Sequence, residues 1–190
     1  KKLKIKEIYS IGGPSAIAAV AYGTKKIKPV NKVIGPGNQY VAAAKKEVFG
    51  DIGIEGMTAG PSEVTIVADK TSNPEWIASD LIGQAEHDIL AQCILISKDK
   101  KILELTRKEI FKQLKLIPRS SIAKKSLMTN GILMNVSSDK KIIEIINKLG
   151  PEHLEISIKK YKPLVSKIKN AGSVCLGKYG AMAMTDYGVP

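Results

Sequence analysis

The sequence predicts an α/β protein built on mainly parallel sheets with flanking helices. Two observations support this class. Short β-branched runs alternate with alanine-rich or amphipathic stretches along the chain, and glycine- or proline-containing turns separate them. A length of 190 residues with 44% hydrophobic content is enough to bury a core.

The first third of the chain contains two predicted strand-turn-helix units. Residues 2–9 mix lysine with isoleucine and leucine and predict a short strand, and residues 15–22 are small and apolar, as in a helix packed closely on a sheet. A strand at 32–34, a turn at 35–38 and a helix at 40–49 follow. Two consecutive units of this kind indicate parallel βαβ construction.

The rest of the chain continues the alternation. The run EVTIVAD at residues 63–69 predicts a strand, and Asn73-Pro74 predicts the start of a helix that reaches about residue 87. Further strands are predicted at 91–97, 131–136, 154–158 and 172–177, and further helices at 101–116 and 139–149. The glycine-rich stretch at 53–60 predicts a boundary between two sub-domains, residues 1–61 and 62–190.

Charge and cysteine usage narrow the classes of protein. The formal net charge of +12 makes nucleic acid or an acidic membrane a possible partner. However, only Arg107 and Arg119 are arginines, and the lysines are scattered in pairs. We therefore expect a solvated lysine-rich surface, with no nucleic acid and no membrane as partner. Cys93 and Cys175 lie in apolar runs, which predicts buried free thiols. With no leader and no apolar run of about 20 residues, a cytoplasmic protein is expected.

Two turns resemble anion or ligand sites only weakly. GPGNQY at 35–40 lies between a predicted strand and a helix, where free backbone amides can hold a phosphate, although any tight turn needs the same residues. In AGPSEV, Ser62 either faces a ligand or bonds its own backbone.

Histidines mark the stronger candidates. In GQAEHD, Gln84 and His87 are three residues apart, so a helix would place them side by side, as a metal site or as an ordinary surface histidine. In GPEHLEI, Glu152 and His153 adjoin at a predicted junction, where they either exchange protons with a substrate or are chance neighbours. Asp186, in MTDY, says little by itself.

Seven segments in this order resemble the histidinol dehydrogenase family, and they cover almost the whole chain. They are GGPSAIAAVAYGT, GPGNQYVAAAKKEVFG, AGPSEVTIVAD, NPEWIASDLIGQAEHD, GPEHLEI, NAGSVCLG and TDY. The family oxidises L-histidinol through the aldehyde to L-histidine in the last steps of histidine biosynthesis, reducing two NAD+, and it binds zinc. The resemblance implies incomplete Rossmann-like sub-domains, with the cofactor side in residues 1–61 and the zinc and substrate residues in 62–190. It also implies a homodimer.

The resemblance implies a role for each matching residue. The implied zinc ligands are Gln84, His87 and Asp186, and the implied proton acceptors are Glu152 and His153. The implied NAD contacts are Asn38 and Ser15, and the implied substrate contacts are Ser62, Gln84, His87, His153 and Asp186. A zinc ion with nitrogen and oxygen ligands suits the imidazole and amine of histidinol, and Glu152 suits activation of water in the second oxidation.

Departures from the family leave three alternatives. Ser15 replaces a glutamine, Thr185 replaces a glycine before Asp186, and the family's N-terminal half-domain and its C-terminal zinc-ligand histidine have no counterpart here. The chain is thus expected to be an enzyme that has lost its ends, with weak or no turnover, or an inactive folded relic. A basic nucleic-acid-binding module, with affinity that falls steeply with salt, is the third alternative.

Overall fold

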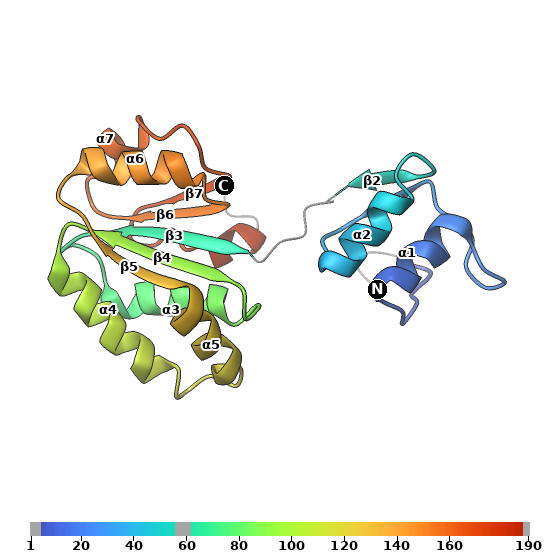
Figure 1. The fold of residues 1–190 in the computed structure, drawn as a ribbon, viewed down its shortest axis with the longest axis horizontal. Helices are drawn as coiled ribbons and strands as arrows, with labels where there is room; N and C mark the ends of the chain where they lie inside the picture. Colours follow the sequence, from blue (N-terminus) through green and yellow to red (C-terminus); the bar gives the residue numbers. More distant parts are fainter. Residues whose placement is uncertain (1–4, 56–61, 188–190) are drawn as a thin grey trace. The chain divides into compact units, whose positions relative to one another are not determined.

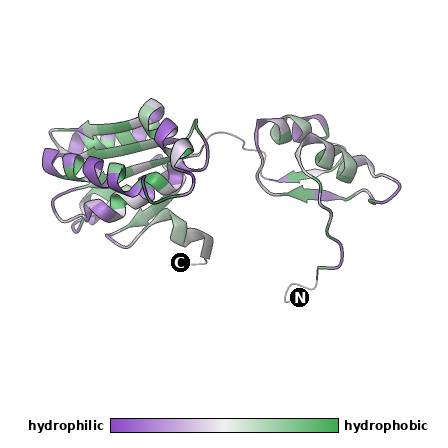
Figure 2. Cartoon of the chain, turned by 90° about the horizontal axis from the view of Figure 1, so that it is seen from below, coloured by the Kyte–Doolittle hydropathy of each residue, from purple (hydrophilic) through white to green (hydrophobic). Residues whose placement is uncertain are grey.

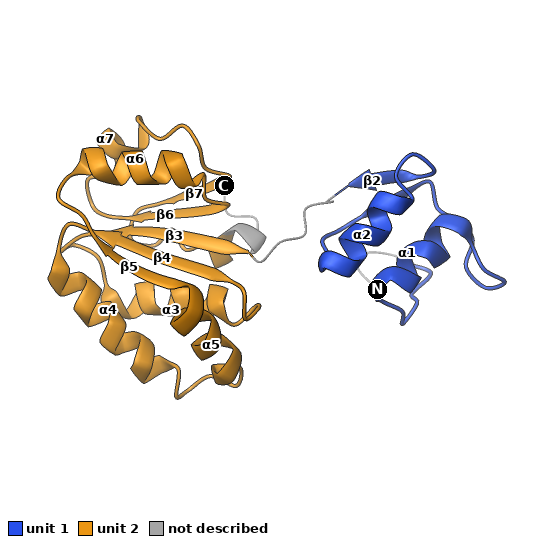
Figure 3. Cartoon of the chain, in the orientation of Figure 1, with its two compact units in different colours: residues 1–60 blue, residues 61–190 orange. Residues whose placement is uncertain are grey.

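A computed structural model describes residues 5–55 and 62–187, and the chain divides into two compact units, residues 1–60 and 61–190 (Figure 3). Both units contain parallel strands flanked by helices. The predicted α/β class with mainly parallel sheets is therefore confirmed.

The first unit pairs two helices with a two-stranded parallel sheet. Its elements are α1 (Gly13–Tyr22), β1 (Lys32–Ile34), α2 (Gln39–Glu47) and β2 (Gly53–Glu55). Its small core contains Ile17, Ala21 and Val48. Residues 5–9 form no strand, so the prediction for 2–9 is wrong there, while residues 2–4 lie outside the described residues. Strand β2 was not predicted, since a three-residue strand is too short for a periodic pattern.

The second unit is a five-stranded parallel sheet covered by helices (Figure 1). In chain order the elements are β3 (Glu63–Ala68), α3 (Pro74–Ala85), β4 (Gln92–Ser97), α4 (Lys100–Gln113), α5 (Ser120–Asn130), β5 (Gly131–Asn135), α6 (Asp139–Leu149), β6 (His153–Ser157), α7 (Lys162–Val165), β7 (Ser173–Leu176) and the 3-10 helix η1 (Met182–Tyr187). The strand order is β5-β4-β3-β6-β7. The order reverses at β3, as in a doubly wound sheet.

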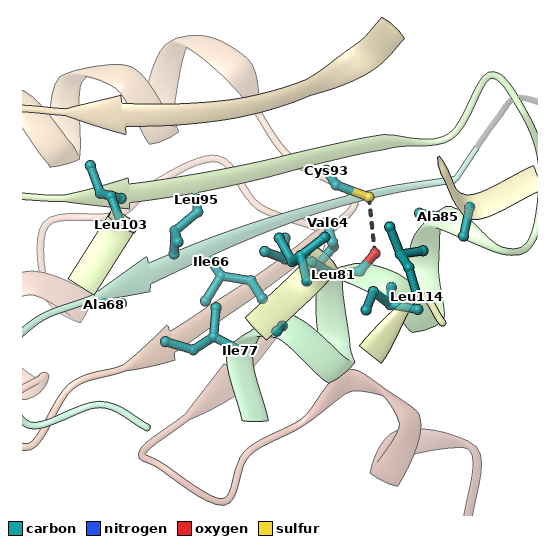
Figure 4. Packing of buried hydrophobic residues seen from close by; sticks show 14 of the residues in the cluster. Val64, Ile66, Ala68, Ile77, Leu81, Ala85, Cys93, Leu95, Leu103 and Leu114 are labelled. Carbon is teal, nitrogen blue, oxygen red and sulfur yellow. Dashed lines mark hydrogen bonds between the residues drawn. The ribbon is translucent and has the colours of Figure 1, made fainter. Parts of the chain in front are cut away.

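Alternation along β3 divides the core between the two faces of the sheet. Val64 and Ile66 pack with Ile77 and Leu81 of α3 (Figure 4), whereas Val67 belongs to a separate cluster beneath α6 and α7. The strands of the second unit are coloured hydrophobic over most of their length, whereas its helices alternate between hydrophilic and hydrophobic residues (Figure 2). A sheet buried on both faces explains why EVTIVA is almost continuously apolar.

The helix α3 begins where the sequence predicts and ends earlier. The side chain of Asn73 accepts a hydrogen bond from the backbone N–H of Glu75 at 2.9 Å, and Pro74 occupies the first turn. The helix ends at Ala85, so His87 lies just beyond its C-cap, in a turn where the His87 backbone N–H donates to the backbone oxygen of Gln84 at 3.3 Å.

At the carboxyl ends of β3 and β6, the two following loops are tied together. Ser72 Oγ donates a short hydrogen bond to the backbone oxygen of Ser157, and the backbone N–H of Lys159 donates to Thr71 Oγ1 at 3.1 Å. In open α/β sheets the crevice at such a reversal of strand order is the usual ligand site. Here hydrogen bonds between the loops join its two sides.

Candidate active site

Four of the candidate residues lie at the opposite, amino edge of the second sheet. Ser62 directly precedes β3, and Glu152 directly precedes β6, which begins at His153. The two strands are parallel neighbours, with Val64 opposite His153, so their amino ends meet. Since α3 returns from the carboxyl edge to the amino edge, it brings Gln84, in its last turn, to the same end of the sheet.

Glu152 is held by a reciprocal pair of hydrogen bonds with Glu63. The backbone N–H of Glu63 donates to Glu152 Oε2 at 3.4 Å, and the backbone N–H of Glu152 donates to Glu63 Oε1 at 3.1 Å. The Glu152 side chain is 54% exposed and its Oε1 atom lies 3.7 Å from Nε2 of His153. The carboxylate is therefore anchored by one oxygen and directed toward the imidazole and solvent by the other.

Two buried nitrogen atoms at this edge lack partners. Among the described residues, neither His153 Nδ1 nor Gln84 Nε2 has a hydrogen-bond partner, although both atoms are shielded from solvent. A buried polar atom without a partner costs free energy, and such atoms in native proteins often mark a ligand site. His87 is exposed, and its backbone oxygen accepts a 3.5 Å hydrogen bond from Arg119 Nη2.

The third expected zinc ligand, Asp186, lies near the C-terminal end of the described residues. The backbone of Asp186 belongs to η1, whereas its side chain lies outside the described residues. Among the described residues, no group of three or more His, Cys, Asp and Glu side chains could hold a metal ion. Gln84 and His87 offer an amide oxygen and an imidazole nitrogen, ligand types that suit zinc. The Gln84 amide nitrogen is a hydrogen-bond donor, and it has no partner among the described residues.

A pair of carboxyl groups, the buried Glu155 and the half-buried Asp80, lies on the same face of the sheet. Glu155, on β6, is 2% exposed and shares a hydrogen bond with Asp80 of α3. Burial, together with the like charge of Asp80, raises the pKa of Glu155 to about 8, and burial raises the pKa of Asp80 to about 6. A hydrogen bond between two carboxyl groups requires a shared proton, which these raised values supply at neutral pH.

The turn that precedes α2 in the first unit is held by three residues, Gly37, Asn38 and Lys45. Asn38 Oδ1 accepts hydrogen bonds from the backbone N–H groups of Tyr40 and Val41, both at 3.1 Å, and so caps α2. A Cβ atom at Gly37 would lie 2.4 Å from Val41 Cγ1, so the turn needs glycine there. The buried Lys45 donates a short hydrogen bond to the backbone oxygen of Gly35. The NH2 group of exposed Asn38 takes no part in the cap.

Comparison with known proteins identifies the family. Residues 1–189 match the family model described as histidinol dehydrogenase. The chain belongs to the histidinol dehydrogenase family. It is 76% identical over 189 residues to the histidinol dehydrogenase of Pelagibacter ubique, covering all of this chain and 44% of that protein. It is 49% identical over 183 residues to that of Listeria monocytogenes, covering 96% of this chain and 43% of the relative.

A solved structure supports the same family assignment. The crystal structure of histidinol dehydrogenase from Elizabethkingia anophelis superposes with a TM-score of 0.89 at 41% sequence identity, covering 97% of this chain and 42% of that one. The chain thus spans less than half the length of these relatives.

The candidate residues are divided between the two units of the chain. Ser62, Gln84, Glu152 and His153 share the amino edge of the second sheet, whereas Asn38 and Ser15 belong to the first unit, where Ser15 is exposed on α1. Both arginines make contacts within the chain, since the Arg107 guanidinium lies 5.7 Å from the centre of the Phe111 ring and Arg119 bonds His87.

Sequence reasoning missed Asp80, Glu155 and Glu63. Glu155 was hidden inside the predicted strand LEISI, and Asp80 inside an apolar helix. Glu155 could have been found from the alternation along its strand. It follows His153 by two residues and so occupies a position that faces the core. A charged residue at such a position indicates a buried partner.

Proposed function

We propose that this chain carries the proton-transfer and part of the zinc-binding machinery of a histidinol dehydrogenase, which oxidises L-histidinol through the aldehyde to L-histidine with two NAD+ in histidine biosynthesis. The observation that carries the proposal is the Glu152–His153 pair. It is anchored to β3 through Glu63 and lies at the same edge as the Gln84 amide, whose nitrogen has no partner among the described residues.

Glu152 and His153 are the proposed proton acceptors. Alcohol oxidation releases the hydroxyl proton, and hydration of the aldehyde requires a base that takes a proton from water. One Glu152 oxygen is held by the Glu63 amide, while the other lies 3.7 Å from the His153 imidazole. The pair thus presents a carboxylate and an imidazole side by side, as relay of a proton from substrate to solvent requires.

Gln84, His87 and Asp186 are proposed to hold zinc. When bound, the ion would hold the imidazole and amine of histidinol and orient the carbinol carbon. Ser62, Gln84, His87, His153 and Asp186 are the proposed substrate contacts. Ser62 supports this assignment because it directly precedes β3, at the edge where Glu152 and His153 lie.

The first unit is proposed to contact NAD through Asn38 and Ser15. Asn38 fixes the first turn of α2 with its oxygen, which leaves its NH2 group to donate to a cofactor. Ser15 is shorter than the glutamine of the family, so its contribution is expected to be weaker. The cofactor side would then belong to residues 1–61 and the zinc and substrate side to 62–190.

Assembly and location complete the proposal. We infer a homodimer in the cytoplasm, in line with the family. The edge strand β5 exposes Ile132 (38%) and Leu133 (40%), and Cys93 and Cys175 are free thiols, as a reducing compartment would allow. Within residues 5–55 and 62–187, no helix has the length and apolar content to cross a bilayer.

The test uses the 190-residue chain and a chimera. In the chimera this chain replaces the matching segment of the Pelagibacter ubique histidinol dehydrogenase. NADH formation from L-histidinol and NAD+ is followed with added zinc, and His153→Ala is the comparison in both proteins. Turnover in the chimera that His153→Ala abolishes supports the proposal. An inactive chimera that is folded and binds zinc overturns it and favours the relic.

The chain alone answers a second question. Turnover by the isolated chain, lost in its His153→Ala variant, would mean that its own residues suffice. An active chimera with an inactive isolated chain would mean that the machinery is intact but depends on segments of the relative.

A further inference from the structure

Two polar rows face each other between β6 and α3. His153 and Glu155 are two residues apart on a strand, so their side chains share one face of the sheet, while Leu154 belongs to the cluster beneath α6 and α7 on the other face. Asp80 and Gln84 are four residues apart on α3, so they lie on one face of the helix. The rows meet where Glu155 bonds Asp80.

Glu155 also bonds the start of η1. The backbone N–H of Met182 donates to Glu155 Oε1 at 2.7 Å. Cys175 lies opposite Glu155 in the register of β6 and β7, and its Sγ atom lies 3.3 Å from Sδ of Met182. The first residue of η1 is therefore held by a carboxyl oxygen on its backbone and by a thiol on its side chain.

This contact links the carboxyl pair to the candidate site. Met182 is the first residue of η1, and Asp186 follows in the same short helix. Glu155 is buried and Asp80 beside it is half-buried, and holding two acidic groups together in such a place is unfavourable unless they make specific bonds. Burial of an apolar pair would fill the same space without fixing the Met182 backbone.

We propose that Glu155, supported by Asp80, is a positioning residue that fixes the start of η1 and thereby places Asp186 for metal binding. The link from Glu155 to η1 stands on the geometry alone. Its last step, from η1 to zinc, rests on the proposed function.

The test compares two substitutions of Glu155, one that keeps its hydrogen bonds and one that removes them. Glu155→Gln keeps an oxygen that accepts the Met182 N–H and an NH2 group that donates to Asp80, whereas Glu155→Leu fills the space without either bond. Ile66→Val, at the position opposite Glu155 on β3, is the control for general loosening of the same strand pair. The measurements are hydrogen exchange of the Met182 amide in the zinc-free chain and zinc affinity by competition with a chelating dye.

We expect Glu155→Leu to speed exchange of the Met182 amide by at least about 10-fold and to weaken zinc binding by about 10- to 100-fold. Glu155→Gln and Ile66→Val should stay within about 3-fold of the parent in both measurements. Global unfolding is monitored through exchange of the Ile66 amide, or the Leu95 amide in the Ile66 variant, and a Glu155→Leu protein that fails to fold is replaced by Glu155→Met.

Each outcome decides the inference. If the leucine and glutamine variants exchange Met182 alike, Glu155 does not anchor η1 and the inference is overturned. If exchange differs but zinc affinity does not, the positioning role is overturned. If the parent chain binds no zinc, the proposed zinc role of this chain fails, and the exchange comparison alone then supports or overturns the anchoring of η1 by Glu155.

Discussion

Glu63 and Glu152 hold each other across the amino edge of the sheet, each donating its backbone N–H to the other's carboxylate, at 3.4 and 3.1 Å. The pairing makes Glu63, which has no proposed contact with substrate, a determinant of where the Glu152 carboxylate lies. Catalytic groups are sensitive to small displacements, so the pairing is open to test.

The first prediction concerns Glu63. Glu63→Ala removes the acceptor for the Glu152 N–H, and we expect kcat of the chimera to fall about 10- to 100-fold with little change in KM. Glu63→Gln keeps an oxygen acceptor and should retain most of the activity. Equal losses in both variants would contradict a role for this hydrogen bond.

The second prediction concerns Glu152 itself. Glu152→Gln keeps the shape of the side chain but removes the base, so we expect kcat of the chimera to fall about 10²- to 10⁴-fold. Zinc affinity of the chain should be unchanged, since Glu152 is not a proposed ligand. Glu144→Gln, an exposed change on α6, is the control. Activity of Glu152→Gln within 3-fold of the parent, an allowance of about 0.7 kcal/mol, would exclude Glu152 as the base.

The third prediction concerns pH and the carboxyl pair. Burial raises the pKa of Glu155 from 4.5 to about 8 and that of Asp80 from 3.8 to about 6. As pH rises from the ordinary carboxyl range to about 8, the unfolded chain releases protons that the folded chain keeps, so the free energy of unfolding contributed by the pair falls. The contribution is fully present below the unfolded pKa values.

Urea unfolding at a series of pH values measures this effect. We expect the parent to lose more stability than Glu155→Gln between about pH 5 and 8, because glutamine does not titrate. Glu144→Gln should follow the parent. Parallel profiles for the parent and Glu155→Gln would show that the pair does not hold an additional proton in the folded chain.

The fourth prediction concerns the metal. Gln84→Leu removes a proposed zinc ligand and also relieves a buried amide nitrogen that has no partner among the described residues. We expect weaker zinc binding by at least about 10-fold together with unchanged or higher stability. Gln39→Leu, an exposed change at the start of α2, should alter neither. Unchanged zinc affinity in Gln84→Leu would remove Gln84 from the ligand set.

The fifth prediction concerns the thiols. Burial raises the pKa of Cys93 to about 12, and its Sγ atom donates to the backbone oxygen of Leu81 at 3.3 Å. Because the thiolate is the reactive form, iodoacetamide at pH 8 should leave Cys93 unmodified in the folded chain and modify it in urea. Mass spectrometry of the peptides reads the result, and rapid native modification of Cys93 would contradict its burial.

The sequence predicted those features of the fold that depend on local pattern. Strand β3 follows from the β-branched run in EVTIVAD and the start of α3 from the Asn73-Pro74 cap, and both were confirmed. Helix α5 was missed, because SSIAKKSLMTN contains no acidic residue in its first turn and no clear apolar stripe. Tertiary contacts stabilise the helix instead. Ala123 is buried in the core, and Ser126 Oγ donates a hydrogen bond to the backbone oxygen of Ala91.

The sequence offered candidate site residues, but it did not show how they are arranged. The adjacency of Glu152 and His153 is visible in the sequence, whereas the bonds from Glu152 to Glu63 and from Glu155 to Met182 join segments far apart in the chain. Only the parallel register of β3, β6 and β7 brings them together. No local pattern contains that register.

The hydrogen bonds that join Thr71 to Lys159 and Ser72 to Ser157 have a consequence for engineering. They lie at the carboxyl end of the sheet, whereas the proposed proton acceptors Glu152 and His153 lie at the amino end, so the loop contacts and the proposed catalytic groups occupy separate regions of one scaffold. Thermostabilising changes can be sought in the loops after β3 and β6 with little risk to the amino-edge residues. Changes aimed at the proposed substrate contacts belong at the opposite end, where the strands begin.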